Sequence, residues 1–309
     1  DHLGDMLAVL DSVIFRPEID RDILETEKVV VLEEIAKSES EPSDVAYDRA
    51  IKVLYPQHNF RFPILGTTSS VSGMKATRVR EYMRSYHRPQ AMVLGMCGDL
   101  PSIDEWSDIL HERAHGLSRK TRAANAIEIP RDFGSPTPMR ADARGEEEWD
   151  KIASSFTERM FPVEIGNFSK EERVAAGVLQ RIMGGGEYSM MFTRIRRERG
   201  LTYSCGAFQY GTLDAGILSA YTFTRRQNVS EVEDITSDIV SKIVSGHISD
   251  DTFRMAKNDA LGGMERLMNA PSSMLGFYVG AQHDPDESRR MLPDEMLRIL
   301  EGVTKKDVV

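Results

Sequence analysis

Cysteine is scarce in this sequence of 309 residues: Cys97 and Cys205 are the only two, and they lie far apart in unlike segments. Neither a disulfide framework nor a paired-cysteine metal knuckle can be built from them. Free thiols are best suited to a reducing compartment, so we expect a cytoplasmic protein.

Long apolar runs and an excess of positive charge are also lacking. No segment approaches the roughly 20 consecutive apolar residues that a membrane-spanning helix requires, and the N-terminal residues lack the basic region and cleavage site of a secretory signal. The 39 basic residues against 49 acidic ones give a net charge of −10. No overall field therefore draws the chain to nucleic acid or to an anionic membrane, and we expect neither as a partner.

The length is that of two domains, since one domain takes roughly 100 to 200 residues. Residues 118–138 change from basic to small residues and then carry three prolines, which predicts a linker at 121–138. We expect residues 1–120 to form the C-terminal part of a first domain and residues 139–309 a second domain, which repeats the order of helix, strand and helix.

The hydrophobic pattern predicts helices and strands that mix without a strict βαβ alternation, so we expect an α+β fold. Helices are expected at 6–14, 24–41, 45–54, 77–86, 102–117, 170–183, 192–198, 229–245, 251–268 and 294–300. Strands are expected at 91–97, 152–163, 203–210 and 216–224. Two of the helices begin with a capping box, formed by Ser102 with Glu105 and by Ser169 with Glu172.

In the helix expected at 24–41, two acidic residues lie on the apolar side rather than on the side expected to face solvent. At about 100° per residue, Glu27 and Glu34 project from nearly the same side of the helix. A carboxylate buried in an apolar stripe must find a cation, a hydrogen-bond donor or a metal, so the pair indicates a metal or acid–base site. The alternative is a charged helix whose acids pair with nearby basic residues. The apolar residues on that side are Ile23, Leu24, Val30 and Val31, and the nearby basic residues are Arg16, Arg21, Lys28 and Lys37.

Residues 111–115 read HERAH, which matches the HExxH zinc motif. Both histidines, His111 and His115, lie on the solvent flank of the apolar stripe of their expected helix. The next acid is Glu128, in the linker, so no third ligand follows in a convincing context. We therefore favour a solvated helix end over a zinc site here.

Four arginines gather between residues 194 and 199. A nucleic-acid patch is disfavoured, because the chain is acidic and no aromatic residue is interleaved among the arginines. A sharper hypothesis is that Arg196 and Tyr203, on either side of the helix end at Gly200, supply a cation and a hydroxyl donor to one anionic or carbonyl oxygen. The triple glycine at 184–186 follows a helix, so it indicates a helix stop or a flexible cover over a cleft rather than a phosphate-binding loop.

These segments resemble the inverted-zincin metallopeptidases of the pitrilysin, insulinase and mitochondrial processing peptidase group, and the resemblance covers nearly the whole chain. Residues 27–34, EKVVVLEE, are similar to the segment in which a supporting Glu precedes the third zinc ligand by seven positions. Residues 63–67, PILGT, and a strand that ends in Gly98 and Asp99 are further matches. Residues 183–203 resemble the long signature LGGGxxSxLFxxxRExxGLxY.

The resemblance implies two homologous α+β domains, each a mixed sheet with packed helices, that close over a peptide cleft. It implies zinc-dependent hydrolysis of peptides or small proteins, with Glu34 as a zinc ligand and Glu27 as the carboxylate that supports it. Arg196 and Tyr203 would bind the substrate carbonyl or the oxyanion. A homodimer is common among the shorter members of the group.

One departure from the family pattern is the HxxEH motif, which supplies two zinc ligands and the general base and is absent from these 309 residues. It lies roughly 70 to 80 residues before the third ligand in such proteins, so we expect it upstream of Asp1, in a first domain that is incomplete here. By itself, the chain is expected neither to hold catalytic zinc nor to cleave peptides. The alternative is a non-catalytic scaffold or regulatory subunit.

Overall fold

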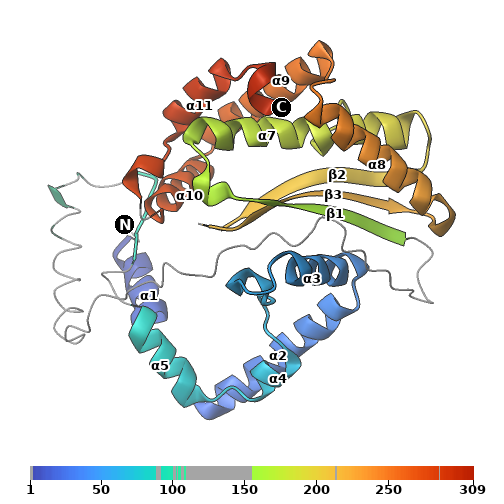
Figure 1. Ribbon diagram of the computed structural model, residues 1–309. Coiled ribbons are helices and arrows are strands. Elements are labelled where there is room, and N and C mark those ends of the chain that lie inside the picture. The colour runs from blue at the N-terminus through green and yellow to red at the C-terminus, as the bar shows by residue number, and fades with distance from the viewer. Residues whose placement is uncertain are drawn as a thin grey trace. The chain divides into compact units, whose positions relative to one another are not determined.

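The computed structural model describes residues 3–87, 92–99, 102, 104, 105, 108, 155–212, 214–284 and 286–309 (Figure 1). They fall into two compact units. One unit takes its residues from Asp1–Glu41 and Phe62–Asp132, and the other from Pro42–Arg61 and Phe133–Val309. The sequence did not indicate that residues 42–61 group with the second half of the chain. Whether the two halves are homologous domains joined by a linker stays a prediction.

All the regular secondary structure in the described part of the first unit is helical. Its helices are α1 (Leu3–Phe15), α2 (Arg21–Glu39), α4 (Thr68–Ser72) and α5 (Ala76–Tyr86). The Asp20 side chain starts α2 by accepting a hydrogen bond from the Ile23 backbone N–H at 2.8 Å. In α5, Arg80 donates from Nε to the Ile19 carbonyl at 2.9 Å, and α4 packs against α2. The long charged helix predicted around Glu27 and Glu34 is confirmed.

The buried strand predicted at 91–97 is wrong for the residues that the structure describes. Residues 92–97 have no regular secondary structure, and the side chains of Val93, Leu94 and Cys97 are exposed. A strand needs a neighbouring strand for its backbone hydrogen bonds. The described part of the first unit contains no strand that could pair with residues 92–97. The capping box of Ser102 and Glu105 is confirmed. The HERAH segment and the linker lie outside the described residues.

The second unit is built on a three-stranded antiparallel sheet. Its strands are β1 (Ser155–Val163), β2 (Thr202–Gly211) and β3 (Gly216–Thr224), in the order β1-β3-β2. β3 has the bounds predicted from the sequence. The expected mixed sheet is not seen, because every strand pairing of the described residues is antiparallel.

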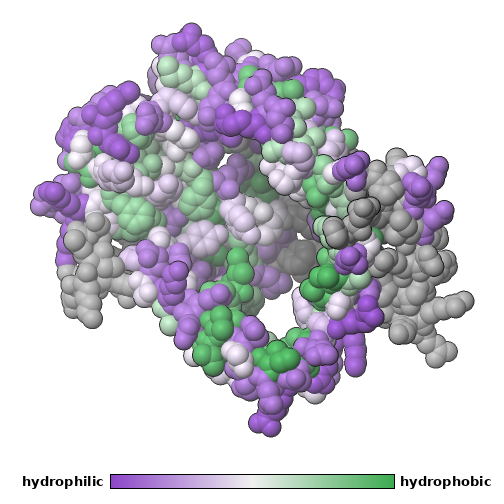
Figure 2. Space-filling view, turned by 180° about the vertical axis from the view of Figure 1, so that it is seen from behind, coloured by the Kyte–Doolittle hydropathy of each residue, from purple (hydrophilic) through white to green (hydrophobic). Residues whose placement is uncertain are grey.

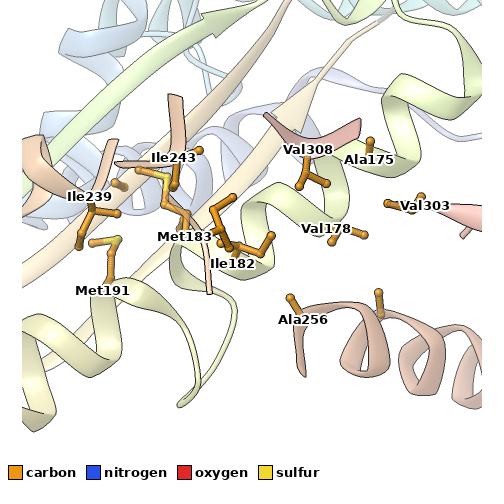
Figure 3. Packing of buried hydrophobic residues seen from close by; sticks show 14 of the residues in the cluster. Ala175, Val178, Ile182, Met183, Met191, Ile239, Ile243, Ala256, Val303 and Val308 are labelled. Atoms are coloured by element: carbon orange, nitrogen blue, oxygen red, sulfur yellow. The ribbon is translucent and has the colours of Figure 1, made fainter. Parts of the chain in front are cut away.

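Helices cover both faces of this sheet (Figure 1). Because side chains alternate along a strand, Leu218 and Ala220 of β3 face the core beneath α7 and α8, whereas Ile217 faces α3. Figure 3 shows the larger core, in which α7 contributes Val178, Ile182 and Met183. The helices of this unit are α3 (Pro42–Leu54), α7 (Lys170–Gly184), α8 (Val229–Val244), α9 (Asp250–Met268), α10 (Pro271–Gln282) and α11 (Pro293–Gly302).

Helix α7 begins as the sequence predicted. The Ser169 backbone N–H donates to Glu172 Oε2 at 2.7 Å, and the Glu172 N–H donates to Ser169 Oγ at 3.1 Å. The far end of α7 meets the sheet closely, since a Cβ built on Gly184 would stand 2.2 Å from the Ala207 backbone nitrogen. Among the described residues, no helix combines the length and hydrophobicity that crossing a bilayer would require.

Candidate functional site

The acidic pair of α2 is exposed to solvent. Glu27 and Glu34 are both exposed, and so are their apolar neighbours Ile23 and Val30, at 44% and 48%. The prediction that the two acids are buried is wrong for the described residues, whereas Leu24 and Val31 of the predicted apolar stripe are half-buried. The buried residues of α2 are Lys28 and Ile35, which are also seven positions apart but on a side turned by about 100°.

Glu27 and Glu34 also have no ion pair or hydrogen bond with any other described side chain, so the pairing with Lys28 considered from the sequence is not what the structure shows. Lys28 instead donates from Nζ to Glu25 Oε1 at 2.8 Å and to the Ser72 carbonyl at 3.3 Å. The two acids thus stand on one exposed face of α2, together with the exposed side chains of Ile23 and Val30. Figure 2 shows that hydrophobic side chains reach the surface of the molecule between hydrophilic ones.

No group of three or more His, Cys, Asp or Glu side chains within the described ranges could hold a metal ion. If Glu34 binds a metal, the described residues around it do not provide the other ligands. A catalytic zinc takes three protein ligands and leaves one position open, so the described residues do not make up a zinc site by themselves.

Arg196 and Tyr203, which the sequence analysis paired, are in contact. The guanidinium carbon of Arg196 lies over the Tyr203 ring at 4.8 Å from its centroid, and over the Phe192 ring at the same distance. Arg196 lies on the π-helical turn Phe192–Arg197, a rare conformation that occurs frequently at functional sites. Phe192 matches the family signature in the sequence but was not predicted to be a site residue, although its spacing of four residues from Arg196 was the available signal.

Arg196 differs from the other arginines of this segment in its partners. Arg194 pairs with Asp238, Arg197 donates to Thr193 and Arg199 pairs with Glu231. Among the described residues, Arg196 has no hydrogen-bond acceptor and no carboxylate partner. Its half-buried guanidinium is held by aromatic rings alone, so its N–H groups can donate to a ligand.

The chain reversal at Gly200 brings Tyr203 back over Arg196. Gly200 has φ of +61°, in the left-handed region that glycine adopts without strain, and its N–H donates to the Arg196 carbonyl at 3.0 Å. A register shift between Thr202 and Ser204 follows at the start of β2. The intervening Tyr203 is 84% exposed, so its hydroxyl is open to solvent.

Cys205, two positions after Tyr203 on β2, is not a candidate nucleophile. Burial raises the pKa of its thiol to about 11, and the opposing effect of Arg196 is smaller. The thiolate is the reactive form, so the group is almost wholly protonated at neutral pH. The triple glycine serves as the helix stop considered from the sequence, because α7 ends at Gly184 and Gly185 is its C-cap.

Comparison with known proteins identifies the family to which this chain belongs. Residues 73–259 match the family model described as the Peptidase M16 inactive domain. The chain belongs to the M16 peptidase family. This confirms the resemblance to the pitrilysin group. The matched range includes the triple glycine, Arg196 and Tyr203, whereas Glu27 and Glu34 lie before it.

Relatives with similar sequences include bacterial zinc proteases and a subunit of the human mitochondrial-processing peptidase. An uncharacterized zinc protease of Mycobacterium leprae is 28% identical over 85% of this chain and 59% of its own length. The uncharacterized zinc protease YmxG of Bacillus subtilis is 24% identical over 89% of this chain and 64% of its own length. The human mitochondrial-processing peptidase subunit alpha is 21% identical over 99% and 61%. The chain thus spans about three fifths of these relatives.

Solved structures show the same fold. A protease from Helicobacter pylori matches with a TM-score of 0.81 at 14% identity, over 100% of this chain and 73% of that one. The peptidase M16 inactive domain from Pseudomonas fluorescens matches with a TM-score of 0.80 at 17% identity, over 99% and 70%. The α+β architecture is therefore that of M16 proteins.

Proposed function

We propose that this chain is part of a zinc-dependent metallopeptidase that hydrolyses peptides or small proteins, and that Arg196 and Tyr203 bind the substrate. The observation that carries the proposal is the Arg196 guanidinium, which lies over two aromatic rings beside an exposed tyrosine hydroxyl and has no acceptor among the described residues. The zinc protease names of the relatives support the same function.

The chemistry of this pair suits a peptide carbonyl. A guanidinium whose position is already fixed can donate to a carbonyl oxygen, and more strongly to the oxyanion that forms from it, without reorganising during the reaction. The Tyr203 hydroxyl adds a second donor. Both groups would therefore stabilise negative charge that develops on the substrate.

We assign Glu34 to the metal and Glu27 to its support. The described residues cannot complete a zinc site, so the proposal places the remaining ligands and the general base in an HxxEH motif outside this sequence. Zinc would polarise the scissile carbonyl and acidify a water molecule there. The exposure of Glu27 and Glu34 on one face of α2 supports the assignment, because both can be reached by groups from elsewhere. By itself, this chain is not expected to cleave peptides.

Glu34→Gln in the complete protein tests the assignment, with Glu33→Gln as the control on the adjacent exposed residue. Zinc content is measured by mass spectrometry and hydrolysis with a quenched fluorescent peptide library. Glu34→Gln should lose both zinc and activity, and Glu33→Gln should keep both. Stoichiometric zinc in Glu34→Gln would refute the assignment. Glu27→Gln should lower activity or zinc affinity roughly 10- to 100-fold.

The second candidate is a non-catalytic scaffold or regulatory subunit of such a peptidase. It is favoured by the description of the matched model as an inactive domain and by the absence of HxxEH from these residues. The sequence of the reading frame before Asp1 discriminates between the two candidates. An upstream HxxEH motif supports the peptidase, and its absence supports the subunit.

A further inference from the structure

Phe192 contributes only its aromatic ring to the site. Its backbone N–H donates to the oxygen of the buried Ser189 at 3.3 Å, and the buried side chains of Met191 and Ile195 hold the turn to the core. The ring is half-buried and carries no polar atom that could meet a ligand. It therefore lies on a well-anchored part of the fold, unlike the exposed Tyr203.

We infer that Phe192 is a positioning residue for Arg196, an inference that rests on the proposed function of that arginine. The cation lies over the face of the Phe192 ring, where the ring quadrupole attracts it. This attraction holds the guanidinium without occupying any of its N–H groups. A carboxylate partner would hold it more tightly but would take the donors that the substrate needs.

Substitutions at Phe192 can separate the effect of its aromatic ring from the effect of its volume. A leucine fills a similar hydrophobic space but has no quadrupole, so Phe192→Leu removes the contact with the cation and keeps most of the packing. Tyrosine and tryptophan keep the aromatic face. If Phe192 served only the core, leucine would be tolerated and Arg196 would be irrelevant to the outcome.

A double-mutant cycle in the complete protein tests this distinction. Phe192→Leu should lower kcat/KM for peptide hydrolysis roughly 3- to 30-fold, mainly through kcat, in the protein that carries Arg196. In the Arg196→Ala background, the same substitution should change kcat/KM less than twofold. Phe192→Tyr or Phe192→Trp should restore most of the rate.

Phe253→Leu is the control, because Phe253 is also a half-buried phenylalanine and packs against the larger core. It should act equally in both backgrounds, and thermal unfolding of all variants shows which of them are folded. An equal loss from Phe192→Leu with and without Arg196, or no loss in either background, would overturn the inference and leave the proposed function standing. If Arg196→Ala itself leaves hydrolysis unchanged, the proposed substrate-binding role falls, and the inference with it.

Discussion

His58 Nε2 lies 3.1 Å from the Asp214 carboxylate, although the two residues are 156 positions apart. The other ring nitrogen of His58 accepts from the Phe60 N–H at 3.1 Å, so Nε2 carries the proton and donates to Asp214. Three residues before His58, the Tyr55 hydroxyl donates to the Gly216 carbonyl at the start of β3. These contacts hold α3 and the loop after it on the β2–β3 hairpin.

Tyr55→Phe should loosen this attachment. Tyr55 is 1% exposed, so its hydroxyl bond is shielded from water, and loss of the bond should lower the free energy of unfolding by about 1 to 2 kcal/mol. Urea denaturation measures the loss, and hydrogen exchange should show faster exchange in the β2–β3 hairpin. Tyr278→Phe on the half-exposed face of α10 is the control, and equal stability of the two variants would contradict the role given to Tyr55.

Gly184→Ala should be strongly destabilising. The new Cβ would stand 2.2 Å from the Ala207 nitrogen and 2.4 Å from the Gly206 carbonyl carbon. These are backbone atoms of the sheet, which cannot move aside without breaking β2 pairings, so we expect a loss of roughly 3 kcal/mol or more.

Gly276→Ala is the matched control for this substitution. Its added Cβ meets nothing within 4 Å, and Gly276 lies inside α10. Alanine there should stabilise the protein by about 0.5 to 1 kcal/mol through helix propensity. Thermal unfolding of the two variants should shift in opposite directions, and a tolerated Gly184→Ala would mean that α7 and β2 do not meet this closely.

Glu158 should make stability depend on pH. Burial raises the pKa of its carboxyl group from 4.5 to about 7, and the Ser219 hydroxyl, which donates to Oε1 at 2.7 Å, opposes the shift. The folded state then binds more protons than the unfolded state between these two values. The stabilisation that the protonated Glu158 carboxyl group contributes to the folded state is fully present below pH 4.5 and is lost as the pH rises to about 7.

Glu158→Gln removes this dependence, because the amide stays neutral. At pH 5 the variant and the wild-type protein should differ little, and at pH 8 the variant should be more stable by about 1 to 3 kcal/mol in urea denaturation. Glu301→Gln, at an exposed position of α11, should show no such divergence. A constant difference between Glu158→Gln and wild type across this pH range would disprove the buried, protonated carboxyl.

Local signals allowed most of the secondary structure to be predicted. The capping box at Ser169, the periodicity of α8 and α9 and the alternation of β3 each depend on residues a few positions apart. Helix α10 was missed because its sequence, PSSMLGFYVGAQ, has no charged face to set a helical period. The strand at 91–97 was predicted wrongly because an apolar run does not specify a pairing partner.

The sequence by itself determined the family, the positions of the capped helices and the candidates Glu27, Glu34, Arg196 and Tyr203. Only the tertiary structure decided which side chains meet. It exposed the acidic face of α2, placed α3 on the sheet of the second unit and brought the Phe192 and Tyr203 rings to Arg196. The physical reason is that burial and ring contacts depend on residues brought together by folding, whereas capping and periodicity depend only on neighbours along the chain.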